Sequence, residues 1–477
     1  MTTLASSDSL LGQLQRGQGR GFLRALQEDR SAVRPLLLEC VRNDPRWDRQ
    51  AESRGIYYAS LFLQTGVSPE PLEEALHTCA ENDSEDAEDA EQTILETLGT
   101  LAVRGDISAL DMIRRYLTYD DNWEDVFEIL QDHASSLLRV DEVSRVFDQR
   151  FPNDELLDDT GPFIGYPAHE MWWSLGRVNP RVSRVLRRRE TEVEQRQQQE
   201  KQRQIRFASL SPAQIFAEAT HYSTVYAATL ALQKRVTPDD LDLVLRMAQE
   251  GEKWQRVVAF RGLQQLADAR TLPVVQAFFE SDEAQSGTLY GDAVRALIAL
   301  PSSATLPLAR AWFDAPEYRH QHVALRVLET HATRADVQRI RDALLPSLSR
   351  ETWESNESSL QRTMLEVLAR FPESGPYSEC GITFTQTNSS RVRSAAALVL
   401  ATSDRNTFAQ GVAHECLWDC EAEARLLGCT YADLARPTVL GRIQTLASDH
   451  LEEKEVSGAA HERLALEEAA SGKGRVP

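Results

Sequence analysis

Soft metal ligands gather at one place in the sequence, where His414 is followed by Cys416, Cys420 and Cys429. A structural zinc ion needs four such ligands that converge tetrahedrally. The spacing suits zinc poorly because no C-x-x-C pair is present, although Cys416 and Cys420 could share one face of a helix. Reduced cysteine is also common as a small buried apolar residue. We therefore expect packing here, with neither a metal nor a cofactor.

A second candidate is an aromatic stretch in which His169 is followed by Glu170, Trp172 and Trp173. A histidine beside a glutamate could do acid–base chemistry, because imidazole titrates near neutral pH. Adjacent residues of a helix, however, point about 100° apart, so these two would not converge. Tryptophans also stand where an HExxH zinc motif would continue. We expect the two tryptophans to pack in a core or to line a binding wall, and we predict no catalytic residue.

Other catalytic motifs are missing as well. The sequence contains no GxSxG, no GxxxxGK[ST] and no GxGxxG after a predicted strand. These absences favour a protein without enzymatic activity.

Charge and cysteine usage narrow the class of protein further. The 477 residues include 73 acidic and 52 basic side chains, a net charge of −21. Such a charge repels phosphate, so nucleic acid is a disfavoured partner and no membrane partner is expected. Six cysteines are too few to cross-link so long a chain, and the first residues lack the basic and apolar regions of a secretory signal. We expect reduced thiols and a cytoplasmic location.

One six-residue pattern recurs along the chain, and Val258-Ala-Phe-Arg-Gly-Leu263 shows it best. Its copies end in leucines about 30 to 40 residues apart, the length of two helices and two turns. A second amphipathic segment, such as 241–248, lies between most copies and has helical spacing. Each repeat is therefore predicted to be an A helix followed by a B helix. The copies are 225–230, 292–297, 323–328 and, more weakly, 363–368 and 393–398.

The hexads resemble the B helix of HEAT or HEAT-like repeats. The resemblance covers 208–430 well and 30–175 loosely, and it implies an all-α fold, an α-solenoid of stacked antiparallel helix pairs in two halves. It specifies architecture and not activity. Arginine occupies the fourth hexad position at 261, 295 and 326, and the pattern then departs to Glu366 and Ala396. We expect the arginine stems to pack beside the next repeat with their heads in water.

Four regions are expected along the chain: an N-terminal helical region at 8–178, a charged helical linker at 181–206, C-terminal repeats at 208–450, and a largely disordered tail at 451–477. The linker holds nine Arg and Lys against four Glu. It is either a connector or a recognition element, and the sequence leaves both open. Residues 381–385 look like a short strand.

The expected function is that of a non-enzymatic scaffold or adaptor that binds another protein, for example as an inhibitor, an immunity factor or an assembly factor. The partner is expected to be basic, because a net charge of −21 attracts a basic protein. One alternative is a nucleic-acid-binding or DNA-glycosylase-like HEAT solenoid. A further alternative is a HEAT enzyme of the lyase type, such as a bilin lyase. The candidate binding surface comprises Arg187, Arg188, Arg189, His169, Trp172 and Trp173.

Overall fold

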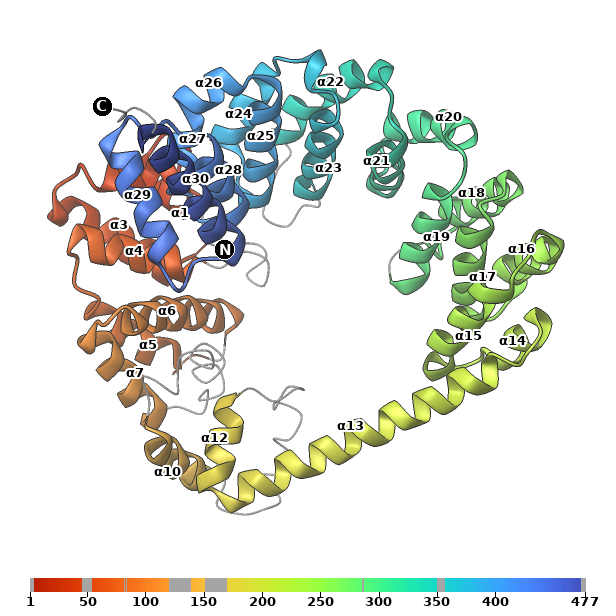
Figure 1. The fold of residues 1–477 in the computed structure, drawn as a ribbon, viewed down its shortest axis with the longest axis horizontal. Helices are drawn as coiled ribbons and strands as arrows, with labels where there is room; N and C mark the ends of the chain where they lie inside the picture. Colours follow the sequence, from red (N-terminus) through yellow and green to blue (C-terminus); the bar gives the residue numbers. More distant parts are fainter. Residues whose placement is uncertain are drawn as a thin grey trace. The chain divides into compact units, whose positions relative to one another are not determined.

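The computed structural model describes residues 4–44, 54–80, 82, 84–119, 139–150, 170–284, 287–349 and 357–472. Every regular element in these ranges is a helix (Figure 1), so the all-α prediction is confirmed. None of the helices within these ranges has both the length and the apolar character needed to cross a bilayer.

The helices belong to two compact units whose bounds differ from the expected regions. Unit 1 comprises Met1–Glu190, Leu348–Ser355 and Gly375–Pro477, and unit 2 comprises Thr191–Ser347 and Asn356–Ser374. The first and the last parts of the chain therefore belong to the same unit. The expected linker is one continuous helix, α13 (Pro180–Phe207), which begins in unit 1 and ends in unit 2.

Unit 2 is a row of helix pairs. Its helices are α14 (Pro212–Glu218), α15 (Tyr222–Arg235), α16 (Leu241–Glu250), α17 (Lys253–Leu266), α18 (Leu272–Glu280), α19 (Thr288–Ile298), α20 (Ser302–Phe313), α21 (Tyr318–His331), α22 (Val337–Leu348) and α23 (Glu357–Ala369). The A helices α16, α18 and α20 each pack on the B helix that follows, and the B helices α15, α17, α19, α21 and α23 pack in sequence (Figure 1). The predicted A-then-B repeat is confirmed in this unit.

The B helices share one burial pattern. In α17, α19, α21 and α23 the first three and the last two hexad residues are buried, and the fourth lies outside the core. Leu263, Leu297 and Leu328 are at most 1% exposed, as predicted. The same pattern in α15 falls on 227–232, two residues later than predicted.

A second register correction concerns α25 (Ser390–Ser403), which belongs to unit 1. The buried pattern there covers 392–397, one residue earlier than predicted, and Leu398 is 40% exposed. Val392, Ala396 and Val399 are buried on the observed face, and Arg393 is buried beside them through its pair with Asp419.

Unit 1 combines helices from both ends of the chain. They are α1 (Leu10–Gln15), α2 (Gly19–Ala25), α3 (Arg30–Arg42), α4 (Gly55–Thr65), α5 (Pro71–Ala80), α6 (Glu85–Val103), α7 (Ile107–Tyr119), α10 (Val140–Arg150), α12 (Glu170–Val178), α24 (Ser378–Gln386), α25, α26 (Arg405–Gln410), α27 (Val412–Cys416), α28 (Ala422–Tyr431), α29 (Pro437–Ser448) and α30 (Lys454–Gly472). Two predictions are wrong here. Residues 381–385 are helical within α24, where the Thr383 hydroxyl donates to the Glu379 carbonyl at 3.0 Å.

The tail is the second correction, because most of it forms α30. This helix packs on α28 and α29, and it buries Val456 and Ala460 completely or almost completely. These two apolar side chains lie one helical turn apart and give the segment a buried face, which its overall composition did not indicate. Residues 473–477 lie outside the described residues.

The N-terminal segment, residues 10–25, packs on helices from the other end of the chain. The Cys420 amide donates to the Gly17 carbonyl at 3.0 Å, and the Phe22 and Trp418 rings lie 5.0 Å apart. The Gln18 side chain donates to the Thr385 carbonyl at 3.1 Å. These contacts join residues more than 360 positions apart, so they close unit 1 from both ends of the sequence.

A glycine makes this close approach feasible. A Cβ atom at Gly19 would lie directly on the Glu415 carbonyl oxygen and 3.1 Å from the Asp419 amide nitrogen. We expect Gly19→Ala to lower the free energy of unfolding by about 1–3 kcal/mol or more, because the added methyl must displace backbone. Urea denaturation followed by circular dichroism measures the change.

Gly441→Ala is the matched control, because a Cβ atom there would meet nothing within 4 Å. Alanine is favoured over glycine inside a helix by about 1 kcal/mol, so this variant should be unchanged or slightly more stable. Equal stability of Gly19→Ala and the natural chain would contradict the packing described for the N-terminal segment.

Candidate binding groove in unit 2

Aromatic side chains occupy the first turn of successive B helices in unit 2. They are Tyr222 of α15, Trp254 of α17, Tyr290 of α19 and Tyr318 of α21. Because consecutive B helices pack side by side, the repeat places these rings in one row. The Tyr290 hydroxyl lies 2.8 Å from Nδ1 of His322, and the Tyr318 ring stacks on His322 at 6.0 Å.

At the α15 end of this row the surface is hollowed into a groove of about 570 Å³. The second half of α13 and the starts of α15, α17 and α19 contribute side chains to it. We call this feature the aromatic groove, and it is lined by Arg196, Gln199, Glu200, Arg203, Tyr222, Ser223, Val225, Tyr226, Trp254, Arg261 and Thr288.

The aromatic residues of the groove are unusually accessible. Tyr222 is 74% exposed and Tyr226 is 56% exposed. The Tyr222 ring lies 5.3 Å from that of Trp254, which is half-buried. Large aromatic side chains normally lose much of their surface to a core, and exposed groups of them mark places where a partner binds.

Charges surround these rings. Arg203 pairs with Glu200 at 3.4 Å and donates to the Ser223 carbonyl at 3.2 Å, which ties α13 to the start of α15. Arg196 forms no ion pair with any residue that the structure describes. The Lys253 ammonium lies 4.7 Å from the centre of the Trp254 ring. Two cationic groups, on Arg196 and Lys253, therefore lie beside the rings without a carboxylate partner from the described residues.

The arginines at the fourth hexad position of the B helices each have a carboxylate partner. Arg261 donates to Asp292 at 3.0 Å, and Arg295 pairs with the same carboxylate. Arg326 pairs with Glu329. In α23 the fourth hexad residue is Glu366. It accepts at 3.0 Å from Arg362, which lies one turn earlier in the same helix. The expected exposed arginine heads are thus neutralised locally.

Net charge divides unevenly between the two units. Counted over their residues, unit 1 carries −19 and unit 2 carries −2, which together give the −21 of the chain. The attraction expected for a basic partner therefore belongs to unit 1 and does not extend to the aromatic groove of unit 2.

The structure does not bring the predicted surface residues together at this groove. Trp172 is 8% exposed and packs edge-on against Phe147 at 6.3 Å, and Trp173 packs on the same core of unit 1. Arg187 and Arg188 are exposed on α13, whereas Arg189 is half-buried. His169 lies outside the described residues. The tryptophans are core residues, which removes them as a stacking platform for a nucleic acid strand.

Cys416 and Cys429 of the cysteine cluster are buried in the fold. Burial raises the pKa of Cys416 well above its ordinary value and raises the pKa of Cys429 to about 12. Among the residues that the structure describes, no group of three or more His, Cys, Asp or Glu is placed to hold a metal ion.

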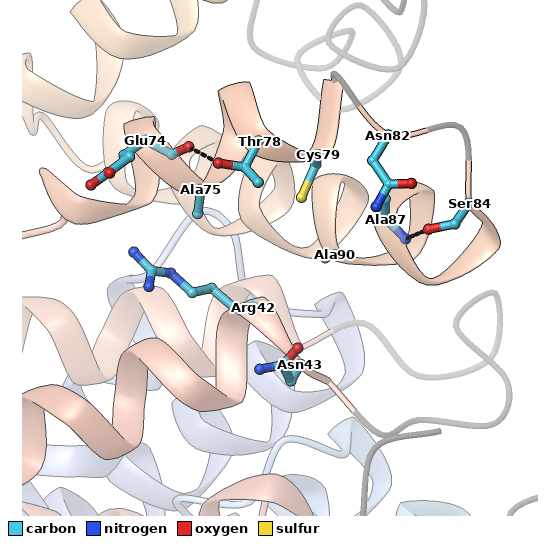
Figure 2. A pocket seen from close by; sticks show the side chains of 10 residues that line it. All are labelled: Arg42, Asn43, Glu74, Ala75, Thr78, Cys79, Asn82, Ser84, Ala87 and Ala90. Atoms are coloured by element: carbon cyan, nitrogen blue, oxygen red, sulfur yellow. Dashed lines mark hydrogen bonds between the residues drawn. The ribbon is translucent and has the colours of Figure 1, made fainter.

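A second hollow of about 430 Å³ lies in unit 1 between α3 and the α5–α6 pair (Figure 2). Its polar groups already serve the fold. Arg42 donates to the Pro71 carbonyl at 2.8 Å, Thr78 donates to the Glu74 carbonyl at 2.9 Å, and Ser84 accepts from the Ala87 amide at 3.3 Å. We interpret this hollow as a crevice between helices.

The chain was compared with protein families, curated proteins and solved structures. No protein-family model matches the chain, and no curated protein matches it in sequence. Among solved structures, Kap121p is similar over 95% of this chain and 53% of its own, with 14% identity and a TM-score of 0.30. The chain therefore spans about half the length of Kap121p. An engineered protein from a structural genomics consortium is similar over 94% and 98%, with 13% identity and a TM-score of 0.25.

The helix pairs of unit 2 thus define the class of protein, an all-α chain with a helical-repeat solenoid. Membership of the HEAT family stays a prediction. The sequence prediction did not include the groove. An aromatic residue lies two to five positions before four of the hexads, a less regular signal than the arginine at the fixed fourth position.

Proposed function

We propose that the protein is a non-enzymatic interaction protein that holds a partner protein in the aromatic groove. The observation that supports this most strongly is the exposure of Tyr222 and Tyr226 beside Trp254 in a concave surface. Tyrosine, tryptophan and arginine are the side chains that contribute most to binding at protein interfaces. All three types line this groove.

Several features agree with a binding protein without catalysis. The six cysteines form no disulfide with one another, and burial raises the pKa of Cys416 and Cys429. The side chains lining the groove include no nucleophile placed beside a base. The basic partner expected from the net charge remains part of the proposal for unit 1 alone, and the reduced thiols fit the expected cytoplasmic location.

The test replaces Tyr222 and Tyr226 by alanine in the full chain. The natural chain and the variant are used to capture partners, and the captured protein is purified and its affinity measured. We expect the double variant to bind about tenfold to a hundredfold more weakly, because truncating a central aromatic residue commonly costs about 2 kcal/mol or more.

Ile205→Ala is the control, because Ile205 is 74% exposed on α13 and does not line the groove. It should bind as the natural chain does. If the Tyr222→Ala/Tyr226→Ala variant keeps the natural affinity for the captured protein, the groove is not the binding site and the proposal fails.

A further inference from the structure

We infer that the occupant of the aromatic groove is an extended acidic segment of a partner protein that carries aromatic or large apolar side chains among its carboxylates. This inference rests on the proposed function and adds the chemistry of the partner. The net charge of the whole chain predicts a basic partner, whereas this inference predicts an acidic one, so an experiment can distinguish the two.

Two cations carry the inference: Arg196, which lines the groove, and Lys253, whose ammonium lies over the Trp254 ring of the groove. Arg203 and Arg261 are occupied by Glu200 and Asp292, but Arg196 and Lys253 have no carboxylate partner among the described residues. Both side chains are exposed beside the exposed rings. Carboxylates of a bound segment would pair with these two cations, while its apolar side chains contact Tyr222, Tyr226 and Trp254.

The same observations favour a peptide over a nucleic acid strand. A strand needs cations for successive phosphates along its path. Past the groove, Arg295, Arg326 and Arg362 are already paired with carboxylates, which would also repel phosphate. Unit 2 as a whole carries −2. These paired arginines do not extend the unpaired cationic charge of Arg196 along the B helices, which matches a short acidic segment.

The experiment measures fluorescence anisotropy of labelled probes with the full chain at about 50 mM salt, where surface charge is weakly screened. The probes are a peptide of Glu-Glu-Phe repeats, its Lys-Lys-Phe counterpart, and oligo(dT). We expect the acidic peptide alone to bind. Arg196→Glu and Lys253→Glu should each weaken that binding about tenfold, a change of about 1.4 kcal/mol.

Lys201→Glu is the matched control, because Lys201 is an exposed cation on the same helix as Arg196 that neither lines the groove nor lies over one of its rings. It should bind the acidic peptide as the natural chain does. Equal weakening by all three reversals would mean that only net charge matters, which would overturn the inference.

The remaining outcomes separate the inference from the proposed function. If the lysine peptide or oligo(dT) binds more tightly than the acidic peptide, the occupant is not an acidic segment and the inference fails. If no peptide binds but Tyr222→Ala/Tyr226→Ala still loses the captured partner, the inference fails and the proposed function stands. If the tyrosine variant also keeps its partner, both fail.

Discussion

Arg393→Ala should lower the free energy of unfolding of unit 1 by about 3–5 kcal/mol, the cost typical of removing one partner from a buried ion pair. Arg393 and Asp419 are 0% and 1% exposed and form a bidentate pair at 2.7 and 2.9 Å. Without the guanidinium, the buried Asp419 carboxylate would lose its cationic partner and keep the hydrogen bond from the Glu421 amide at 3.0 Å. Urea denaturation measures the loss.

The same substitution should loosen the N-terminal segment. An Arg393 nitrogen also lies 3.4 Å from the Gly17 carbonyl, so the pair connects that segment to α25. Hydrogen exchange of residues 10–25 should therefore become faster, in addition to the global loss of stability.

Two controls sharpen this prediction. Arg270→Ala breaks an exposed pair with Asp268 and should change the free energy of unfolding little, because water screens the pair. The double variant Arg393→Met with Asp419→Leu removes both charges, and it should recover much of the stability that Arg393→Ala loses. If Arg393→Ala costs no more than Arg270→Ala, the buried pair does not hold unit 1 together.

The second large effect is expected in the core of the repeats. Leu263→Ala and Leu328→Ala should each cost about 2–5 kcal/mol, because both side chains are fully buried and leave a cavity when truncated. Thermal or urea denaturation followed by circular dichroism measures both.

Leu398→Ala tests the register at the same time. The sequence pattern makes Leu398 equivalent to Leu263, but the structure leaves it 40% exposed. We expect this variant to cost under about 1 kcal/mol, because little buried surface is lost. A cost equal to that of Leu263→Ala would show that the predicted register, and not the observed one, is correct for α25.

The aromatic residues show why sequence could not locate the site. Trp172 and Trp254 look alike in the sequence, since each lies in a helix near charged residues. Trp172 packs on Phe147 in a core, whereas Trp254 lies beside an exposed tyrosine in a groove. The exposure of a ring depends on what packs over it, which the local sequence does not report.

The sequence by itself determined the helical class and the repeats of unit 2, because these depend on local spacing. Apolar residues at helical intervals fix which face of a helix is buried, and each repeat packs on neighbours close to it in the chain. Leu263, Leu297 and Leu328 therefore lie where the pattern placed them.

Only the tertiary structure decided which helices form unit 1 and which face of α25 is buried. The N-terminal segment contacts residues more than 360 positions away, and no local periodicity reports such a contact. Arg393 looks like a surface residue until Asp419 is brought beside it. A charged side chain can be buried only when its partner is present, and the partner is supplied by the fold.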